Sequence, residues 1–76
     1  MSQSNVHPVY APITGTIWKI PVQPGSAVGE EDVVVIMESM KMEMPVEAGV
    51  VGKVLEIGVR EGEAVTEGQV LVTIEF

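Results

Sequence analysis

The stretch APITGTIWKIPVQPGSAVGEEDVVVIME, residues 11–38, matches AGVVGKVLEIGVREGEAVTEGQVLVTIE, residues 48–75, without a gap. The identical pairs include small residues, glycines and β-branched residues: Ala11/Ala48, Gly15/Gly52, Ile20/Ile57, Val22/Val59, Gly25/Gly62, Ala27/Ala64, Val28/Val65, Val33/Val70 and Val35/Val72. Shared glycines predict the same backbone bends in both copies, and shared β-branched residues predict the same buried face. The chain is therefore an internal repeat whose two copies are expected to fold alike.

Apolar and polar residues alternate within each copy, which is the pattern of strands that bury one face. The residues expected on one side of such strands are Trp18, Ile20 and Val22 with their counterparts Leu55, Ile57 and Val59, and Val33, Val35 and Met37 with Val70, Val72 and Ile74. Trp18 is accordingly predicted to be partly buried core. Turn signals at Pro24-Gly25, Gly62 and Gly68 separate these runs. Since neither copy can bury its apolar face alone, we expect an all-β domain built from two copies around a pseudo-twofold axis.

The composition excludes several classes of site and partner. The 76 residues suffice for one small domain, and the absence of cysteine excludes disulfides, thiolate metal sites and cysteine nucleophiles. Eleven acidic residues against four basic ones give a formal charge of −7, which argues against nucleic acid and anionic membranes as partners. No apolar run approaches the roughly 20 residues of a membrane helix and no leader opens the chain, so a cytoplasmic protein is expected.

Residues 1–7 show no pattern and are expected to form a loose tail ahead of a domain that spans residues 8–76. The single histidine, His7, is expected to lie exposed in that tail. The acidic residues are scattered over predicted strands and turns, without a paired arrangement suited to acid–base catalysis. We therefore expect a chain with no catalytic residue and no metal site of its own.

The link between the two copies, residues 39–47, is the part that the repeat does not explain. From Val33 to Val46 the chain has no glycine, asparagine or aspartate, although it must reverse direction if the copies pair. Tight hairpin turns favour those residues because they adopt positive φ at little cost. The reversal is predicted at Met40-Lys41, where it would be strained, and such strain is commonest at functional sites.

Lys41 stands between Met40 and Met42 at this predicted tip. A lysine at a hairpin tip is ordinarily a solvated charge, and loops are ordinarily polar. Two large thioethers beside it would instead expose apolar surface that no core requires. Since the methionine side chain adapts to many partners, Met40 and Met42 predict a place where a protein or an attached cofactor is bound.

Glu38-Ser39-Met40-Lys41-Met42 resembles the Glu-Ala-Met-Lys-Met signature of biotin carboxyl carrier domains, in which the central lysine receives biotin through an amide. The resemblance extends from Val9 over nearly the whole chain and includes Ala11-Pro12-Ile13-Thr14-Gly15-Thr16 and Met42-Glu43-Met44-Pro45. It implies the barrel-sandwich hybrid fold, a flattened antiparallel barrel of two four-stranded sheets with the lysine on an exposed hairpin. Ser39 departs from the usual alanine, and Glu31 stands opposite Gly68, so the corresponding turns of the two copies are expected to differ in type.

The resemblance also implies a function. Lys41 would hold biotin covalently, Met40 and Met42 would serve recognition, and Glu38 and Ser39 would complete the motif. A biotin protein ligase would attach the biotin. The chain would then carry carboxybiotin between the biotin carboxylase and the carboxyltransferase of a biotin-dependent carboxylase that acts on an acyl-CoA. The ungapped repeat leaves no room for a thumb insertion. The chain therefore resembles short free-standing biotin attachment proteins, akin to the carrier subunit of acetyl-CoA carboxylase in fatty acid biosynthesis.

Three alternatives remain. A lipoyl carrier domain of a 2-oxoacid dehydrogenase complex shares the fold and the lysine, but it typically flanks that lysine with Asp and Ala. A Cu(I)-binding module could use the soft thioethers of Met37, Met40, Met42 and Met44, although strand alternation is expected to split that run between two faces. An interaction module that does not use Lys41 is the third.

Overall fold

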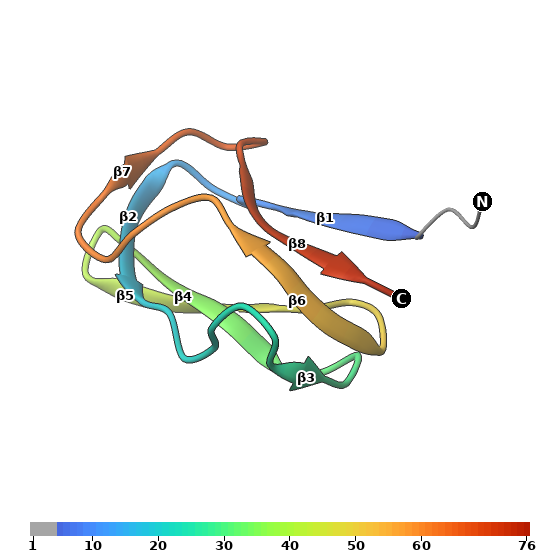
Figure 1. Cartoon of the computed structure of the whole chain (residues 1–76). Coiled ribbons are helices and arrows are strands. Elements are labelled where there is room, and N and C mark those ends of the chain that lie inside the picture. The colour runs from blue at the N-terminus through green and yellow to red at the C-terminus, as the bar shows by residue number, and fades with distance from the viewer. Residues whose placement is uncertain (1–4) are drawn as a thin grey trace.

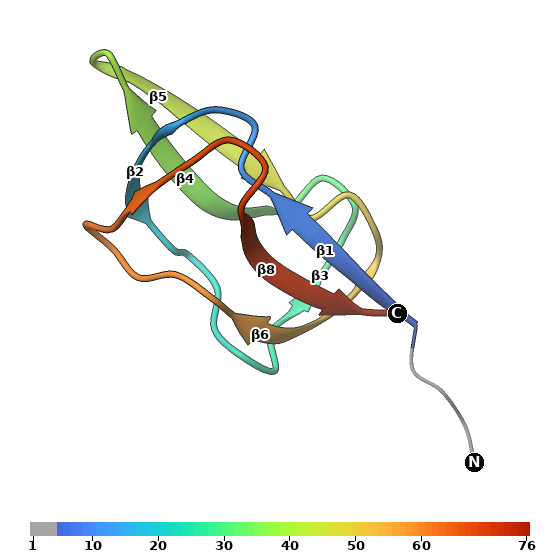
Figure 2. The same ribbon diagram turned by 90° about the horizontal axis from the view of Figure 1, so that it is seen from above.

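The computed structural model describes residues 5–76, and within that range every regular element is a strand. The strands are β1 (Val6–Tyr10), β2 (Gly15–Lys19), β3 (Ala27–Val28), β4 (Val33–Ser39), β5 (Met42–Glu47), β6 (Gly52–Ile57), β7 (Ala64–Val65) and β8 (Val70–Glu75). They form two four-stranded antiparallel sheets, in the orders β1-β8-β6-β3 and β5-β4-β2-β7. The predicted all-β class is confirmed, and Figures 1 and 2 show the two sheets wrapped into a flattened barrel.

The two halves of the chain exchange strands. Each sheet takes two strands from the first half, β1–β4, and two from the second half, β5–β8. Replacing every strand by its counterpart in the other half converts the order of one sheet into the order of the other. The predicted pseudo-twofold repeat is therefore confirmed, and neither half contains a complete sheet by itself.

Backbone hydrogen bonds repeat across the same axis. The Gly25 N–H donates to the carbonyl oxygen of Val54 at 2.8 Å, and the Gly62 N–H donates to that of Ile17 at 2.7 Å. Both glycines adopt positive φ, 94° and 90° respectively, where a residue with a Cβ would be strained. The matching glycines of the sequence thus mark matching turns that tie each half to the other.

The turn at residues 29–32 differs from its counterpart at residues 66–69. Gly68 has a φ of 90°, whereas its counterpart Glu31 is absent from the residues of the 5–76 range that have positive φ. The side chains nevertheless play equivalent parts: the Asp32 carboxylate accepts from the Gly29 N–H at 2.7 Å, and the Gln69 side-chain oxygen accepts from the Thr66 N–H at 3.2 Å. The expected difference in turn type is confirmed.

The core lies between the sheets and obeys the repeat almost residue by residue. Its buried pairs are Val9/Val46, Ala11/Ala48, Ile17/Val54, Val28/Val65, Val34/Leu71, Val35/Val72 and Met37/Ile74, with Val59 matched by the partly buried Val22. Two equivalent apolar faces therefore close on each other, as the repeat requires.

The prediction that Trp18 is core is wrong. Its side chain is 40 % exposed, and that of its counterpart Leu55 is 48 % exposed. The register of β2 against β4 shifts between Ile17 and Lys19, which is a β-bulge at Trp18. Because the extra residue breaks the alternation, Trp18 and Lys19 are both exposed between the buried Ile17 and the partly buried Ile20, so Trp18 does not share a face with Ile20 as predicted. The Lys19 ammonium lies 5.8 Å from the centroid of the Trp18 ring.

The N-terminal boundary also differs from the prediction. Residues 1–4 of the expected tail lie outside the described residues, but Val6 and His7 already belong to β1, where they pair with Glu75 and Ile74. His7 is half-buried, and its ring meets that of Phe76 edge to face at 6.5 Å between centroids. The first sheet therefore begins ahead of the predicted boundary at residue 8, and His7 is packed rather than free.

The two leucines offer a direct test of this core. Leu71 is fully buried between the sheets, so Leu71→Ala is expected to lower the free energy of unfolding by about 2–5 kcal/mol through lost burial and a residual cavity. Leu55→Ala, at the exposed bulge position, is the matched control and should cost less than about 1 kcal/mol. Urea unfolding followed by far-ultraviolet circular dichroism measures both. Equal losses of unfolding free energy in the two variants would contradict the assignment of Leu71 to the core and of Leu55 to the surface.

Candidate functional site

The hairpin of β4 and β5 projects from one end of the barrel, with Met40 and Lys41 as its two-residue turn (Figure 2). The strands stay paired up to the turn, since Ser39 lies opposite Met42 and Glu38 opposite Glu43. The first strand of the hairpin is also paired with β2. A regular, well-paired stem therefore carries the turn outward.

The turn is strained, as the sequence predicted. Met40 has a φ of 53° and Lys41 a φ of 69°, and these are the non-glycine residues with positive φ in the described part of the chain. Positive φ at both central residues is what a type I′ hairpin turn requires. Because neither residue is glycine, asparagine or aspartate, the conformation costs of order 1–3 kcal/mol at each.

Gly15 fixes the base of the hairpin. A Cβ at this position would lie 2.7 Å from the backbone oxygen of Glu38 and 3.3 Å from the Cβ of Ser39. The first distance is too short for a real side chain, so only glycine lets β2 approach the last residues of β4 this closely. The close approach holds the stem of the hairpin against the barrel and leaves only its tip free.

The side chains of the tip are exposed. Lys41 points to solvent, and its neighbours Met40 and Met42 are 92 % and 68 % exposed. Exposed apolar side chains on both sides of one cation are unusual at a loop tip. The structure thus brings together Met40, Lys41 and Met42 as the sequence predicted, with Ser39 half-buried at the end of β4.

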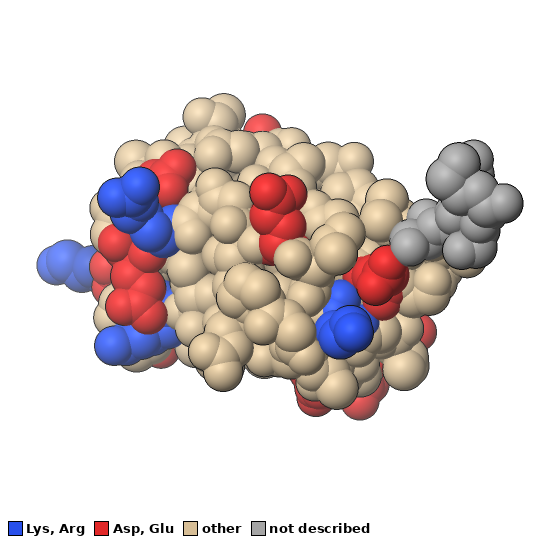
Figure 3. All heavy atoms as spheres, in the orientation of Figure 1, with Lys and Arg blue, Asp and Glu red and all other residues tan. Residues whose placement is uncertain are grey.

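One face of the hairpin is acidic. Glu38 and Glu43 are exposed and lie directly opposite each other, and Thr16 of β2 continues the same row. Like charges that face each other across a sheet are destabilising. Figure 3 shows acidic and basic side chains mixed at the end of the molecule where the hairpin lies.

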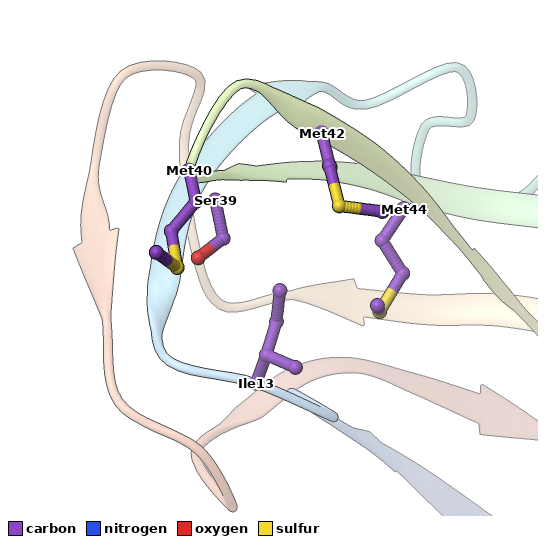
Figure 4. A pocket seen from close by; sticks show the side chains of 5 residues that line it. All are labelled: Ile13, Ser39, Met40, Met42 and Met44. Carbon is purple, nitrogen blue, oxygen red and sulfur yellow. The ribbon is translucent and has the colours of Figure 1, made fainter.

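The other face of the hairpin is apolar and overhangs a hollow of about 190 Å³. Its lining residues are Ile13, Ser39, Met40, Met42 and Met44. In Figure 4, Ile13 points from the segment between β1 and β2 toward the hairpin, and the methionines close the hollow from above. The sequence analysis did not include Ile13 or Met44 in the site. The spacing of Met40, Met42 and Met44 at every second position could have indicated that Met44 shares a face with the other two.

The expectation that strand alternation splits the methionines is wrong. Met37 and Met44 lie directly opposite each other in the hairpin, and Met37 is fully buried in the core. Met40, Met42 and Met44 all line the hollow, so the run continues the inward face of the sheet beyond the barrel. The hairpin therefore has one apolar face along its whole length.

Within residues 5–76, no three histidine or carboxylate side chains lie close enough together to hold a metal ion. The same range holds no helix with the length and apolar character needed to cross a membrane.

A family model described as biotin-requiring enzyme, which joins biotinyl and lipoyl domains, matches residues 7–74. Among solved structures, the urea carboxylase of Kluyveromyces lactis is 34 % identical with a TM-score of 0.88, over 97 % of this chain and 6 % of that one. A single-chain, multi-domain long-chain acyl-CoA carboxylase has the same fold, with 20 % identity and a TM-score of 0.89 over 99 % of this chain and 8 % of that one.

A third similar structure is the lipoyl domain of the 2-oxoglutarate dehydrogenase complex from Azotobacter vinelandii. It is 33 % identical with a TM-score of 0.69, over 80 % of this chain and 77 % of that domain. The chain thus spans less than a tenth of either carboxylase but most of a separate lipoyl domain.

The strain in the turn can be measured. Replacing both central residues with the pair that type I′ turns favour, Met40→Asn with Lys41→Gly, is expected to raise the free energy of unfolding by about 1–2 kcal/mol. For a domain of this size, each kcal/mol corresponds to roughly 4–8 °C in Tm. Thermal unfolding by circular dichroism measures the gain. Lys53→Gly, within β6, is the control and should lower Tm; a Tm that stays unchanged in the double variant would show that the turn carries no strain.

Proposed function

The chain belongs to the biotinyl and lipoyl domain family, and from that premise we propose that it is a biotin carboxyl carrier whose biotin is attached to Lys41. The observation that carries the proposal is the tip of the hairpin. There a strained turn presents one lysine between two exposed thioethers. A turn that served only to connect two strands would avoid both the strain and the exposed apolar surface. Both features are explained if an enzyme that modifies Lys41 recognises the tip.

Attachment would proceed at the Nζ atom of Lys41. That nitrogen forms the C–N bond to the carboxyl carbon of biotin, which a biotin protein ligase has activated; the activating group leaves and the displaced proton passes to solvent. The product is a neutral amide, so the cation at the tip is lost. The exposed position of the turn supports this step, because the nitrogen needs access to a second protein.

The proposed role of the domain is to bind and present the cofactor. Bound biotin supplies the chemistry of carboxyl transfer, and the catalytic groups belong to the partner enzymes. The rigid stem and the flexible lysine arm would bring the carried group to a biotin carboxylase and then to a carboxyltransferase, at an effective concentration on the order of mM. The chain itself would be a non-catalytic part of the enzyme.

The proposed enzyme is a biotin-dependent carboxylase of the cytoplasm, and we favour one that acts on an acyl-CoA, such as acetyl-CoA carboxylase. The similar carboxylases include one for urea and one for long-chain acyl-CoA, which supports the reaction class. The acidic character of the chain, with a net charge of −7, suits partners with basic docking surfaces.

Lipoic acid is the competing cofactor. The identity to the lipoyl domain, 33 %, is nearly the same as that to the urea carboxylase, 34 %, so sequence identity does not separate the two cofactors. The flanks of the lysine favour biotin. Lipoyl domains typically place Asp and Ala beside it, whereas here Met40 and Met42 occupy both positions and extend into an apolar face.

Attachment at Lys41 is testable by intact mass spectrometry after co-expression with a biotin protein ligase. Wild-type protein is expected to gain one biotinyl group. Lys41→Arg keeps the charge but removes the acylated amine, so it should gain none. Lys19→Arg and Lys53→Arg are matched controls on exposed lysines and should be labelled like the wild type. An unmodified wild type in the presence of active ligase would refute the proposal.

The choice of cofactor is tested by exchanging the flanks. Met40→Asp with Met42→Ala should slow biotinylation at least tenfold, the equivalent of about 1.4 kcal/mol, because the ligase loses both thioether contacts. Initial rates of biotin incorporation measure this. A lipoate protein ligase should leave the wild-type chain unmodified; rapid lipoylation of the wild type would instead favour the lipoyl assignment.

A further inference from the structure

The hollow beneath the hairpin lies directly beside the residue that carries the proposed cofactor. Met40, the neighbour of Lys41 in the turn, forms part of its wall, and Met42 on the other side of Lys41 forms another part. Ser39 supplies its single hydroxyl, which Figure 4 shows turned toward the space between Met40 and Ile13. The lining is otherwise hydrocarbon and thioether.

The size of the hollow restricts what it can receive. About 190 Å³ is slightly more than the cavity of roughly 150 Å³ that takes up benzene, and less than the 300–1,000 Å³ of pockets for drug-sized ligands. A group of one or two small rings with a short hydrocarbon chain is therefore of a suitable size, whereas a nucleotide is too large. Polar groups of such a ligand would have to remain at the open side, where water is available.

A group attached to Lys41 does not need high affinity to occupy this hollow. A short flexible tether holds its end at an effective concentration on the order of mM near the point of attachment. A site with an intrinsic Kd of about 1 mM would then be filled about half of the time. Weak apolar contacts suffice for that, and they would still release the group to a partner enzyme.

We propose that the hollow receives the hydrocarbon chain and thioether ring of the biotinyl group on Lys41 between transfers, while the ureido ring stays at the open side. This inference rests on the proposed function. It accounts for Ile13 and Met44, which line the hollow although neither is a sequence neighbour of Lys41, and for an apolar hairpin face that would otherwise stay uncovered. The Ser39 hydroxyl offers a hydrogen bond at the rim, where the usual alanine of the signature offers none.

The experiment compares two adducts at one position. The chain contains no cysteine, so Lys41→Cys provides a unique thiol that iodoacetamide or a biotin-bearing iodoacetamide will alkylate. Both adducts are uncharged, and only one carries the rings. With methionine methyl groups labelled with carbon-13, the biotin adduct should shift the Met42 and Met44 resonances and give nuclear Overhauser effects from the rings to these methyls. The buried Met37 methyl is the internal control and should not move.

A pair of variants localises the contact. Ile13→Thr in the hollow should abolish most of the Met44 shift, whereas Ile20→Thr, at another partly buried isoleucine outside the hollow, should leave it intact. Identical spectra for the two adducts, or shifts that survive Ile13→Thr, would overturn the inference.

Enzymatically biotinylated wild-type protein separates this inference from the proposed function. Its mass increment tests attachment, and its ring-to-methyl Overhauser effects test the hollow. Mass without Overhauser effects would overturn the hollow and leave the carrier function standing. Overhauser effects in the alkylated variant without any mass increment on the wild type would support the hollow as a ring-binding site and overturn the function on Lys41.

Discussion

The pairing of β4 with β5 is the contact on which the site depends, and it exists because the two halves of the chain exchange strands. The same pairing occurs a second time, between β8 and β1, at the equivalent place across the pseudo-twofold axis. There the two strands end at the chain termini, and the Phe76 N–H donates to the Asn5 oxygen at 2.9 Å. Between β4 and β5 the strands are joined instead, and the join must be made within a two-residue turn. The strand exchange therefore determines where the hairpin of β4 and β5 projects.

What occupies that turn is not what folding alone would select. Met40 and Lys41 hold positive φ, and Glu38 faces Glu43 below them. At about 1–3 kcal/mol for each strained residue, the turn consumes a noticeable part of the 5–15 kcal/mol by which domains are ordinarily stable. Residues that oppose local preference persist where recognition requires them. The stem is held by Gly15 and by regular pairing, so the domain combines a firm base with an energetically costly tip.

Much of this architecture was readable in the sequence. Matching glycines and valines predicted the two halves, and the lack of glycine, asparagine and aspartate between Val33 and Val46 predicted a strained reversal at Met40-Lys41. The errors have physical causes that periodicity does not reveal. Trp18 lies on the opposite face from Ile20 because a bulge shifts the register by one residue, and no residue type in β2 predicts that bulge.

Only part of the candidate site could be predicted from the sequence. The motif named Lys41 and its flanks, but the hollow depends on which strand residues lie opposite each other and on Ile13, which comes from a distant segment. The boundary at residue 8 failed for a similar reason, because Val6 and His7 gain their order from pairing with the last strand of the chain. Contacts of this kind are set by tertiary structure and leave no local pattern in the sequence.

The symmetry that joins β4 to β5 also places Asn5 and Phe76, at the start of β1 and the end of β8, at the far end of the barrel from the hairpin of β4 and β5 (Figures 1 and 2). A polypeptide joined to either end would hold the domain by the point most distant from its lysine. Any pivoting at such a joint would swing Lys41 through the widest arc that the domain allows, so the body of the barrel would act as a lever that lengthens the reach of the lysine arm.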